Sequence, residues 1–279
     1  MDIILKIRAF FKSMVERYAT HDVAQTAGQI AYFGFLSIFP FIVFVNFILH
    51  KLNLSGVNIK DLMSPAVPHD IIDLLSSYVT YVSEQNSLGV LSIGIISTIY
   101  LASRVIRSME LSVSKAYGTP TDRPFFKSIA ISITAIICIG LMVVVAVMFV
   151  VFGKKPLELL LSFLSLSEMV GVILFLKWAF VIFVMLMVFA LIYWITPNKK
   201  TTFAEVVPGT IFSLICFIAL SSAFGWYFGY ATSSSSIYGY IGTVFVALVW
   251  IYFVGVIFII GAEMNAYFDS LTGKNEKKT

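Results

Sequence analysis

The stretch VVPGTIFSLICFIALSSAFGWYFGYATSSSSIYGYIGTVFVALVWIYFVGVIFIIGA, residues 206–262, contains no charged side chain and decides the fold class. A bilayer core of about 30 Å needs about 20 apolar residues in a helix, so this stretch is long enough to cross it twice. The polar, Gly-rich segment 229–242 is where the chain must turn back. The stretch therefore predicts two membrane-spanning helices, at about 205–228 and 239–265.

Four more predicted spans precede this stretch, at about 23–50, 87–116, 126–152 and 170–195, and the second of them is expected to continue as a helix past the bilayer. Hydrophobic residues make up 59% of the chain and the mean hydropathy is +0.95, which exclude an ordinary soluble enzyme. We therefore expect an all-α integral membrane protein, with residues 1–279 forming a single domain of six transmembrane helices.

The basic residues are unevenly distributed over this predicted topology. If both termini lie on one side, that side holds fourteen of the nineteen Lys and Arg residues: Lys6, Arg8, Lys12, Arg17, Arg104, Arg107, Lys115, Arg123, Lys127, Lys199, Lys200, Lys274, Lys277 and Lys278. Because Lys and Arg accumulate in cytoplasmic loops, both termini are expected in the cytoplasm of a bacterial plasma-membrane protein. The net charge of +4 follows topology instead of clustering in one domain, so no nucleic-acid partner is expected.

Three segments outside the spans have patterns of their own. In residues 1–20 the apolar side chains recur at helical spacing on one face, and the basic side chains lie on the others. This pattern predicts a helix lying on the inner leaflet, with membrane lipids as its partners. The loop 51–86 carries a second amphipathic pattern and predicts a helix on the outer face. The polar tail 270–279 is expected to be disordered.

The first predicted span carries a polar stripe. At 100° per residue, the following side chains fall within an arc of about 100°: Gln25, Gln29, Tyr32, Asn46 and His50. Polar groups facing hydrocarbon are costly, so the stripe should face protein or water. Two interpretations stay open, namely hydrogen bonds that hold the bundle together and one wall of a transport pathway.

The second predicted span repeats this pattern with a face that grows basic toward the cytoplasm: Ser97, Tyr100, Arg104, Arg107, Ser108 and Lys115. Two guanidinium groups one turn apart can bind a phosphate or carboxylate. The alternative is that the arginines reach the membrane surface, with Glu110 as the helix-surface partner of Arg107.

The last span ends with two polar residues, Glu263 and Asn265, near the inner boundary. We expect a buried ion pair between Glu263 and either Arg104 or Arg107. On the preceding span, Ser221, Gly225 and Gly229 form a ridge of small residues, which predicts close helix packing within the monomer or in a homo-oligomer.

No motif indicates catalysis. The three histidines lie in separate segments, and no spacing typical of a metal site or phosphate-binding loop occurs. Cys138 and Cys216 lie in the middle of different spans, where buried thiols behave as small hydrophobic groups. We expect neither catalytic residues, nor a metal, nor a cofactor.

Several segments, in order along nearly the whole chain, resemble the YihY/BrkB family of bacterial inner-membrane proteins, which carries an old ribonuclease BN label. They are Gln29-Ile-Ala-Tyr32, Leu36-Ser-Ile-Phe-Pro40, Lys115-Ala-Tyr-Gly118, Arg123-Pro124, Thr196-Pro-Asn198, Val207-Pro-Gly209, Tyr238-Gly-Tyr-Ile-Gly242, Leu248-Val-Trp-Ile-Tyr252 and Gly261-Ala-Glu-Met-Asn265. The resemblance implies a six-helix membrane fold and no settled biochemical function. One departure is Ser114, where such sequences commonly have Asn.

These patterns favour a transporter or translocator of a small or amphipathic solute or lipid, with anions among the candidates. The candidate pathway or anion-binding residues are Gln25, Gln29, Tyr32, Asn46, Ser97, Tyr100, Arg104, Arg107, Glu110, Glu263 and Asn265. The alternative is a scaffold or envelope-integrity protein that transports nothing. A ribonuclease is the least favoured function, because the clustered carboxylates or metal ligands that phosphodiester hydrolysis needs are not apparent.

Overall fold

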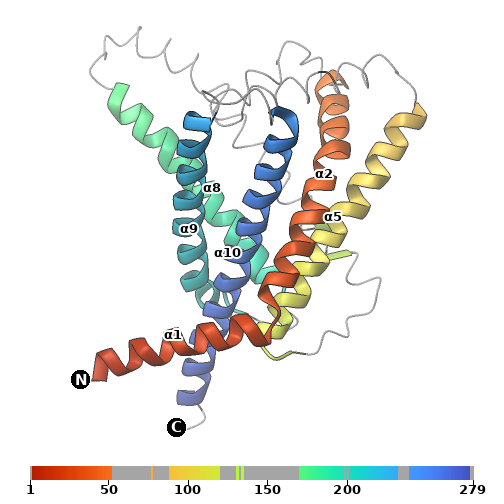
Figure 1. The fold of residues 1–279 in the computed structure, drawn as a ribbon. Helices are drawn as coiled ribbons and strands as arrows, with labels where there is room; N and C mark the ends of the chain where they lie inside the picture. The colour runs from red at the N-terminus through yellow and green to blue at the C-terminus, as the bar shows by residue number, and fades with distance from the viewer. Residues whose placement is uncertain are drawn as a thin grey trace.

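The computed structural model describes residues 2–51, 77, 88–119, 130–131, 133–134, 170–197, 199, 201–231 and 239–276. Within these residues the chain forms helices joined by short turns, without a strand. The helices are α1 (Asp2–Thr20), α2 (Val23–Lys51), α5 (Leu88–Ala116), α8 (Val170–Ile195), α9 (Phe203–Ala231) and α10 (Gly239–Glu276) (Figure 1). The all-helical prediction is confirmed for this part of the chain.

The helix ends follow local sequence chemistry. α5 ends where Gly118 adopts a positive φ of 62°, and the N–H groups of Gly118 and Thr119 bond back to the carbonyls of Lys115 and Ser114. This is the glycine-dependent cap that satisfies the last carbonyls of a helix. α9 begins with a capping box, in which the Glu205 carboxylate accepts a hydrogen bond from the Thr202 N–H at 3.1 Å.

The C-terminal tail and the segments 51–86 and 126–152 differ from the other predicted segments. α10 continues to Glu276, so the prediction of a disordered tail from residue 270 is wrong for residues 270–276. A single glycine, Gly273, lowers helix propensity by about 1 kcal/mol without ending a helix that is otherwise well formed. The third span, at 126–152, and the outer helix of the loop 51–86 lie almost entirely outside the described residues.

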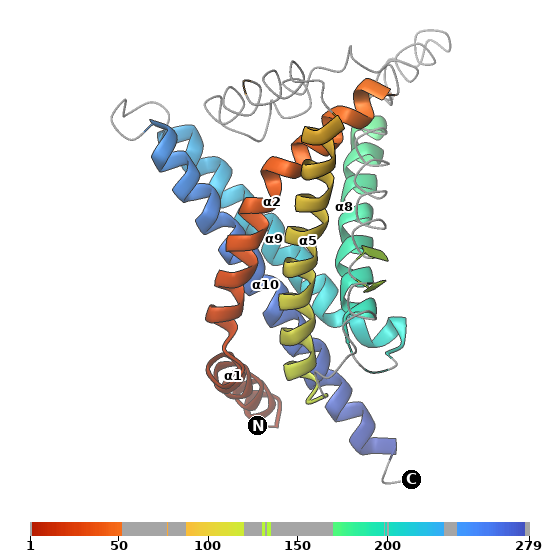
Figure 2. The same cartoon turned by 90° about the vertical axis from the view of Figure 1, so that its right-hand side faces the viewer.

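The helices converge toward the end of the bundle where both termini lie, and α1 runs across that end (Figures 1 and 2). α2 packs against α5 and α10, and α9 packs against α8 and α10. The buried core lies where these helices meet: Val23, Ala27, Ile30, Val113, Ile192, Tyr193, Val206, Phe258, Ile259 and Ala262. The core therefore connects the two turns of α2 nearest α1 with the second half of α10.

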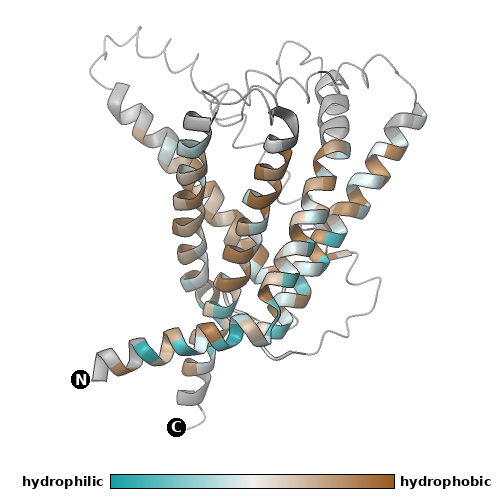
Figure 3. Cartoon of the chain, viewed as in Figure 1, coloured by the Kyte–Doolittle hydropathy of each residue, from teal (hydrophilic) through white to brown (hydrophobic). Residues whose placement is uncertain are grey.

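Polarity is distributed as in a protein surrounded by lipid. Three stretches are long and apolar enough to cross a membrane: Trp178–Ile195, Phe203–Tyr227 and Val244–Leu271. Large apolar side chains face outward on several helices, with Phe175 71% and Trp226 68% exposed, whereas Ser213 and Asn265 are fully buried. Hydrophobic residues dominate α8, α9 and α10, while polar residues gather on α1 and at the converging end (Figure 3).

Candidate functional site

The most deeply buried acid at the converging end is Glu263 on α10, which is 2% exposed. Its Oε2 accepts a hydrogen bond from Arg17 Nη1 at 2.9 Å, and its Oε1 lies 2.5 Å from His21 Nδ1. A carboxylate oxygen can only accept, so this contact is a hydrogen bond in the His21 tautomer that carries its hydrogen on Nδ1. A buried carboxylate is costly unless it is paired and hydrogen-bonded, and α1 with its following turn supplies both partners.

Three helices are connected through Arg17. The same Nη1 that bonds Glu263 also donates to the Ala116 carbonyl, at 3.2 Å, in the last turn of α5. A cation at the C-terminus of a helix interacts favourably with the free carbonyls there. Arg17 thereby fixes α1 against both α5 and α10.

Aromatic contacts hold the middle of α1 on α10. The Phe10 ring lies 5.2 Å from the Tyr267 ring and 6.1 Å from the Phe268 ring, measured between centroids. Beyond α1, the turn at His21 and Asp22 places Asp22 at a φ of 54°, a left-handed conformation that Asp tolerates. This turn lets α2 enter the bundle while His21 stays beside Glu263.

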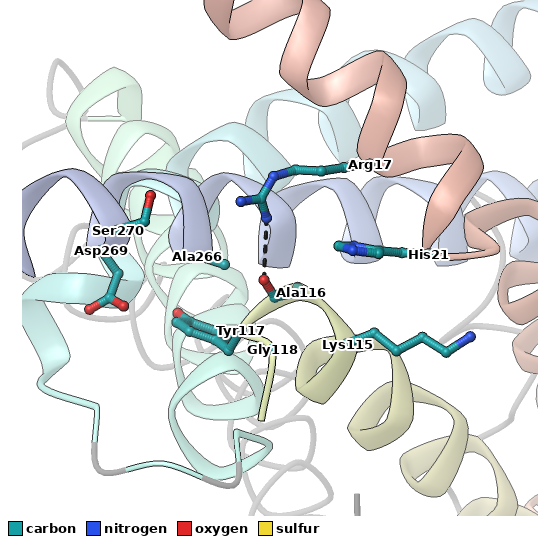
Figure 4. A pocket seen from close by; sticks show the side chains of 9 residues that line it. All are labelled: Arg17, His21, Lys115, Ala116, Tyr117, Gly118, Ala266, Asp269 and Ser270. Carbon is teal, nitrogen blue, oxygen red and sulfur yellow. Dashed lines mark hydrogen bonds between the residues drawn. The ribbon is translucent and has the colours of Figure 1, made fainter. Parts of the chain in front are cut away.

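A pocket of about 390 Å³ opens at this junction (Figure 4). Its walls come from the end of α1 and the turn after it, the end of α5, and the last part of α10: Arg17, His21, Lys115, Ala116, Tyr117, Gly118, Ala266, Asp269 and Ser270. The Cβ position of Gly118 has no atom within 4 Å, so the cap of α5 leaves this side open. The pocket is thus built by segments far apart in the sequence.

Tyr117 is the most perturbed group of the pocket. Burial, followed by the nearby carboxylates of Asp269 and Glu205, raises the pKa of its phenol well above the ordinary range. Its hydroxyl is buried and has no hydrogen-bond partner among the described residues. Lys199 Nζ lies 5.4 Å from the Tyr117 ring centroid and 2.5 Å from an Asp269 carboxylate oxygen. The phenol therefore stays protonated at neutral pH and can donate a hydrogen bond.

A second polar network joins α8, α9 and α10 deeper in the bundle. Tyr193 Oη lies 2.7 Å from Ser213 Oγ and donates to the Phe258 carbonyl at 2.7 Å. The Gly209 N–H donates to Asn265 Oδ1 at 2.6 Å. Interhelical hydrogen bonds of this kind hold helices together in an apolar surrounding. This places Asn265 in helix packing instead of in the pocket.

The polar faces predicted on the first two spans adjoin each other. Ser108 Oγ on α5 lies 3.3 Å from Gln29 Oε1 on α2, and the Arg104 guanidinium lies 5.0 Å from the centre of the Phe33 ring. At this seam between α2 and α5, Ser97 is half-buried. The other candidate pathway side chains predicted there are exposed, namely Gln25, Gln29, Tyr32, Tyr100 and Arg104. Asn46 lies in α2, but its side chain is outside the described part. The seam is therefore an outward-facing surface of the described helices.

Two predicted ion pairs have different outcomes. Arg107 bonds Glu110 at 3.0 Å, which confirms that pair, although Glu110 is 3% exposed and so more than a surface partner. The pairing of Glu263 with Arg104 or Arg107 is wrong, because α1 returns across the bundle end and supplies Arg17 and His21 instead. Helical spacing within a span could not indicate this return.

The small-residue ridge is described at Ser221, whose hydroxyl is buried, and at Gly225, which is exposed. A Cβ added at Gly225 would meet no atom of the described residues within 4 Å, so close packing of the ridge stays a prediction at that position. The close approach of α9 lies at the other end of the helix, where a Cβ at Gly209 would fall 2.0 Å from the Gly261 carbonyl oxygen. Both glycines belong to segments quoted above for the family resemblance.

Sequence reasoning missed several residues of the pocket. Arg17 and His21 are four positions apart and so share a helix face, and this spacing could have indicated a common partner. Lys115, Tyr117 and Gly118 belong to the segment Lys115-Ala-Tyr-Gly118, and Arg17 connects this segment to Glu263 by bonding the Ala116 carbonyl as well. Among the described residues, no group of three or more His, Cys, Asp or Glu side chains could hold a metal ion.

Comparisons with known proteins identify the family of this chain. The chain is 30% identical over 259 residues to a ribonuclease-like protein, YfkH, of Bacillus subtilis (strain 168), covering 92% of this chain and 94% of that protein. It is 24% identical to a UPF0761 membrane protein of Aggregatibacter aphrophilus (94% of this chain, 93% of that protein) and 25% identical to one of Histophilus somni strain 2336 (93% and 90%). No solved structure matches the chain. The family model described as virulence factor BrkB matches residues 14–279, so the chain belongs to the BrkB family of membrane proteins.

Proposed function

We propose that this protein is a transporter or translocator of a small or amphipathic molecule, with an anion as the preferred class. The observation that carries the proposal is Glu263, a 98% buried acid in a membrane-crossing stretch, held by Arg17 and His21 at an open pocket. Ionisable groups inside membrane helices are costly and commonly mark a solute path. The exposed polar seam between α2 and α5 supplies the second wall of the proposed path.

The proposal includes six crossings and cytoplasmic termini in a bacterial plasma membrane. α2 and α5 have 29 residues each, about 43 Å at 1.5 Å per residue, which is enough to cross beside the three more apolar helices. The basic residues listed above support the orientation. A periplasm-active reporter fused after Thr279 should stay inactive, and activity there would contradict this topology.

Membrane lipids are the proposed partners of α1. Phe11, Val15 and Tyr18 form an exposed apolar strip on the side away from Arg17, and Arg8 borders it. Because Phe10 packs on Tyr267 near the end of the span Val244–Leu271, this strip lies close to the level of the headgroups. Self-association through Ser221, Gly225 and Gly229 is also a proposal, with Gly225→Leu expected to abolish it in a crosslinking assay.

Transport is tested in proteoliposomes with two probes, a fluorescent NBD-labelled phosphatidylglycerol quenched by external dithionite and radiolabelled inorganic phosphate. Arg104→Ala and Gln29→Ala should each reduce flux at least fivefold while the folded yield stays unchanged. Lys12→Gln is the matched control, because it removes one exposed charge outside the seam and the pocket. If neither the lipid probe nor phosphate shows flux, the proposed function is overturned.

A scaffold role is the second candidate, favoured by the internal hydrogen bonds of Tyr193, Ser213 and Asn265, which stabilise the bundle without any solute. It predicts that seam variants change only folded yield or assembly. We propose no catalytic role, and the name of the Bacillus subtilis relative is not carried over. RNA that stays intact with purified protein and Mg²⁺ is the expected result, and cleavage that copurifies with the monodisperse protein would contradict it.

A further inference from the structure

The pocket presents more hydrogen-bond donors than its internal contacts use. Arg17 makes both its contacts through Nη1, so the N–H groups of Nε and Nη2 have no partner among the described residues. Lys115 Nζ makes one contact, to Asp22 at 3.0 Å, and an ammonium has three donors.

Three acids around the pocket are each held by a cation. Glu263 is bound by Arg17, Asp22 by Lys115, and Asp269 by Lys199 at 2.5 Å. The negative end of α5 is also satisfied, because the N–H groups of Gly118 and Thr119 and the Arg17 guanidinium bond its last carbonyls. An incoming anion therefore meets unused donors of Arg17 and Lys115, while Glu205, which is outside the pocket lining, accepts a hydrogen bond from the Thr202 N–H.

The geometry of the donors suits a tetrahedral oxyanion. A guanidinium offers paired N–H groups that match phosphate oxygens, and the buried Glu263 fixes this guanidinium from behind. Ligand pockets commonly have volumes of about 300–1,000 Å³, so about 390 Å³ holds a phosphate group together with part of the molecule attached to it. Arg17 reaches the pocket from α1 and faces the end of α5, where it bonds the Ala116 carbonyl (Figure 4).

We propose that this pocket binds a phosphate group, carried either by a phospholipid headgroup or by a small soluble phosphate compound. The proposal rests on the proposed function, since it names the ligand class for the pocket beside Glu263. Arg17 provides the planar pair of donors, and Lys115, in the wall formed by the end of α5, provides a second positive charge. Glu263 is a positioning residue that acts through Arg17.

The test measures the unfolding temperature of the full-length protein in detergent as inorganic phosphate or dihexanoylphosphatidylglycerol is added at constant ionic strength. Lys115→Gln and Arg17→Lys should each raise the apparent Kd about tenfold, because each removes a charged donor or the planar donor pair. Arg17→Lys keeps the charge beside Glu263, so it separates loss of donor geometry from loss of folding. Lys12→Gln, the matched control, should keep the wild-type Kd within about twofold, because Lys12 lies outside the pocket.

The outcomes separate the two phosphate sources and the two proposals. Tighter binding of the lipid than of free phosphate identifies a headgroup, and the reverse identifies a soluble phosphate. A stabilisation that is equal in wild type, Lys115→Gln and Arg17→Lys is a general salt effect and overturns the site. Flux without saturable binding would reject this site and leave the proposed transport function standing. Saturable binding without flux would support the site and reject the transport function.

Discussion

Replacing Gly209 by alanine is expected to separate α9 from α10. The added Cβ would lie 2.0 Å from the Gly261 carbonyl oxygen, whereas ordinary contact begins at 3.4 Å, so the helices must move apart by about 1.4 Å (3.4 − 2.0). The opposing atom belongs to the backbone and cannot rotate away. Overpacking of this kind costs about 1–3 kcal/mol. Loss of the 2.6 Å hydrogen bond from the Gly209 N–H to Asn265 adds about 1 kcal/mol.

The sum, about 3 kcal/mol, corresponds to a fall in unfolding temperature of about 10 °C for a chain of this size. Intrinsic fluorescence of detergent-purified protein, recorded at several heating rates, measures this fall even if unfolding is irreversible. Gly28→Ala is the matched control, because its Cβ would meet no atom within 4 Å and alanine favours the helix by up to about 1 kcal/mol. If Gly209→Ala unfolds at the same temperature as Gly28→Ala, the inferred close contact of α9 and α10 is wrong.

Three further predictions follow from the polar contacts. Arg17→Gln should destabilise the protein by about 3 kcal/mol in thermal unfolding, because it leaves the buried Glu263 carboxylate without its guanidinium partner. Adding Glu263→Gln to this variant should recover part of the lost stability. Strictly additive losses in the double variant would show that the two side chains do not interact. Tyr193→Phe should lower stability by about 1–2 kcal/mol, since it removes the bonds to Ser213 and the Phe258 carbonyl; a variant as stable as wild type would refute these bonds. The raised pKa of Tyr117 favours folding below the ordinary tyrosine pKa near 10, and this contribution is lost as the pH rises toward the folded-state value. Between about pH 10 and 11.5, wild type should therefore lose stability faster than Tyr117→Phe, and parallel curves would contradict the shift.

The closely packed glycines also explain why α9 and α10 can share buried hydrogen bonds. With no side chain at Gly209 and Gly261, the two backbones come close enough for the Gly209 N–H to reach Asn265. A larger residue at either position would hold the helices apart and leave the fully buried Asn265 amide without this partner. Close packing of α9 on α10 and the hydrogen bond to the buried Asn265 side chain therefore depend on the same two glycines.

Much of the helical architecture could be predicted from local patterns. The predicted start of the first span at Val23, the stop after Ala116 and the span 170–195 agree with α2, α5 and α8. The Arg107–Glu110 pair was also predictable, because residues three apart are neighbours on a helix. The pocket was not predictable in this way, since Arg17, Lys115 and Asp269 lie on three different helices.

The sequence by itself determined that the chain is helical and apolar enough for a membrane, and where most of its helices begin and end. These properties depend on hydropathy, periodicity and helix-ending residues such as Gly118, which act over a few neighbouring positions. Only the tertiary structure decided that Glu263 pairs with Arg17 and His21 and that Gly209 lies against Gly261. Those contacts depend on how α1 crosses the bundle end and how closely α9 approaches α10, and no pattern within one helix encodes the relative placement of two.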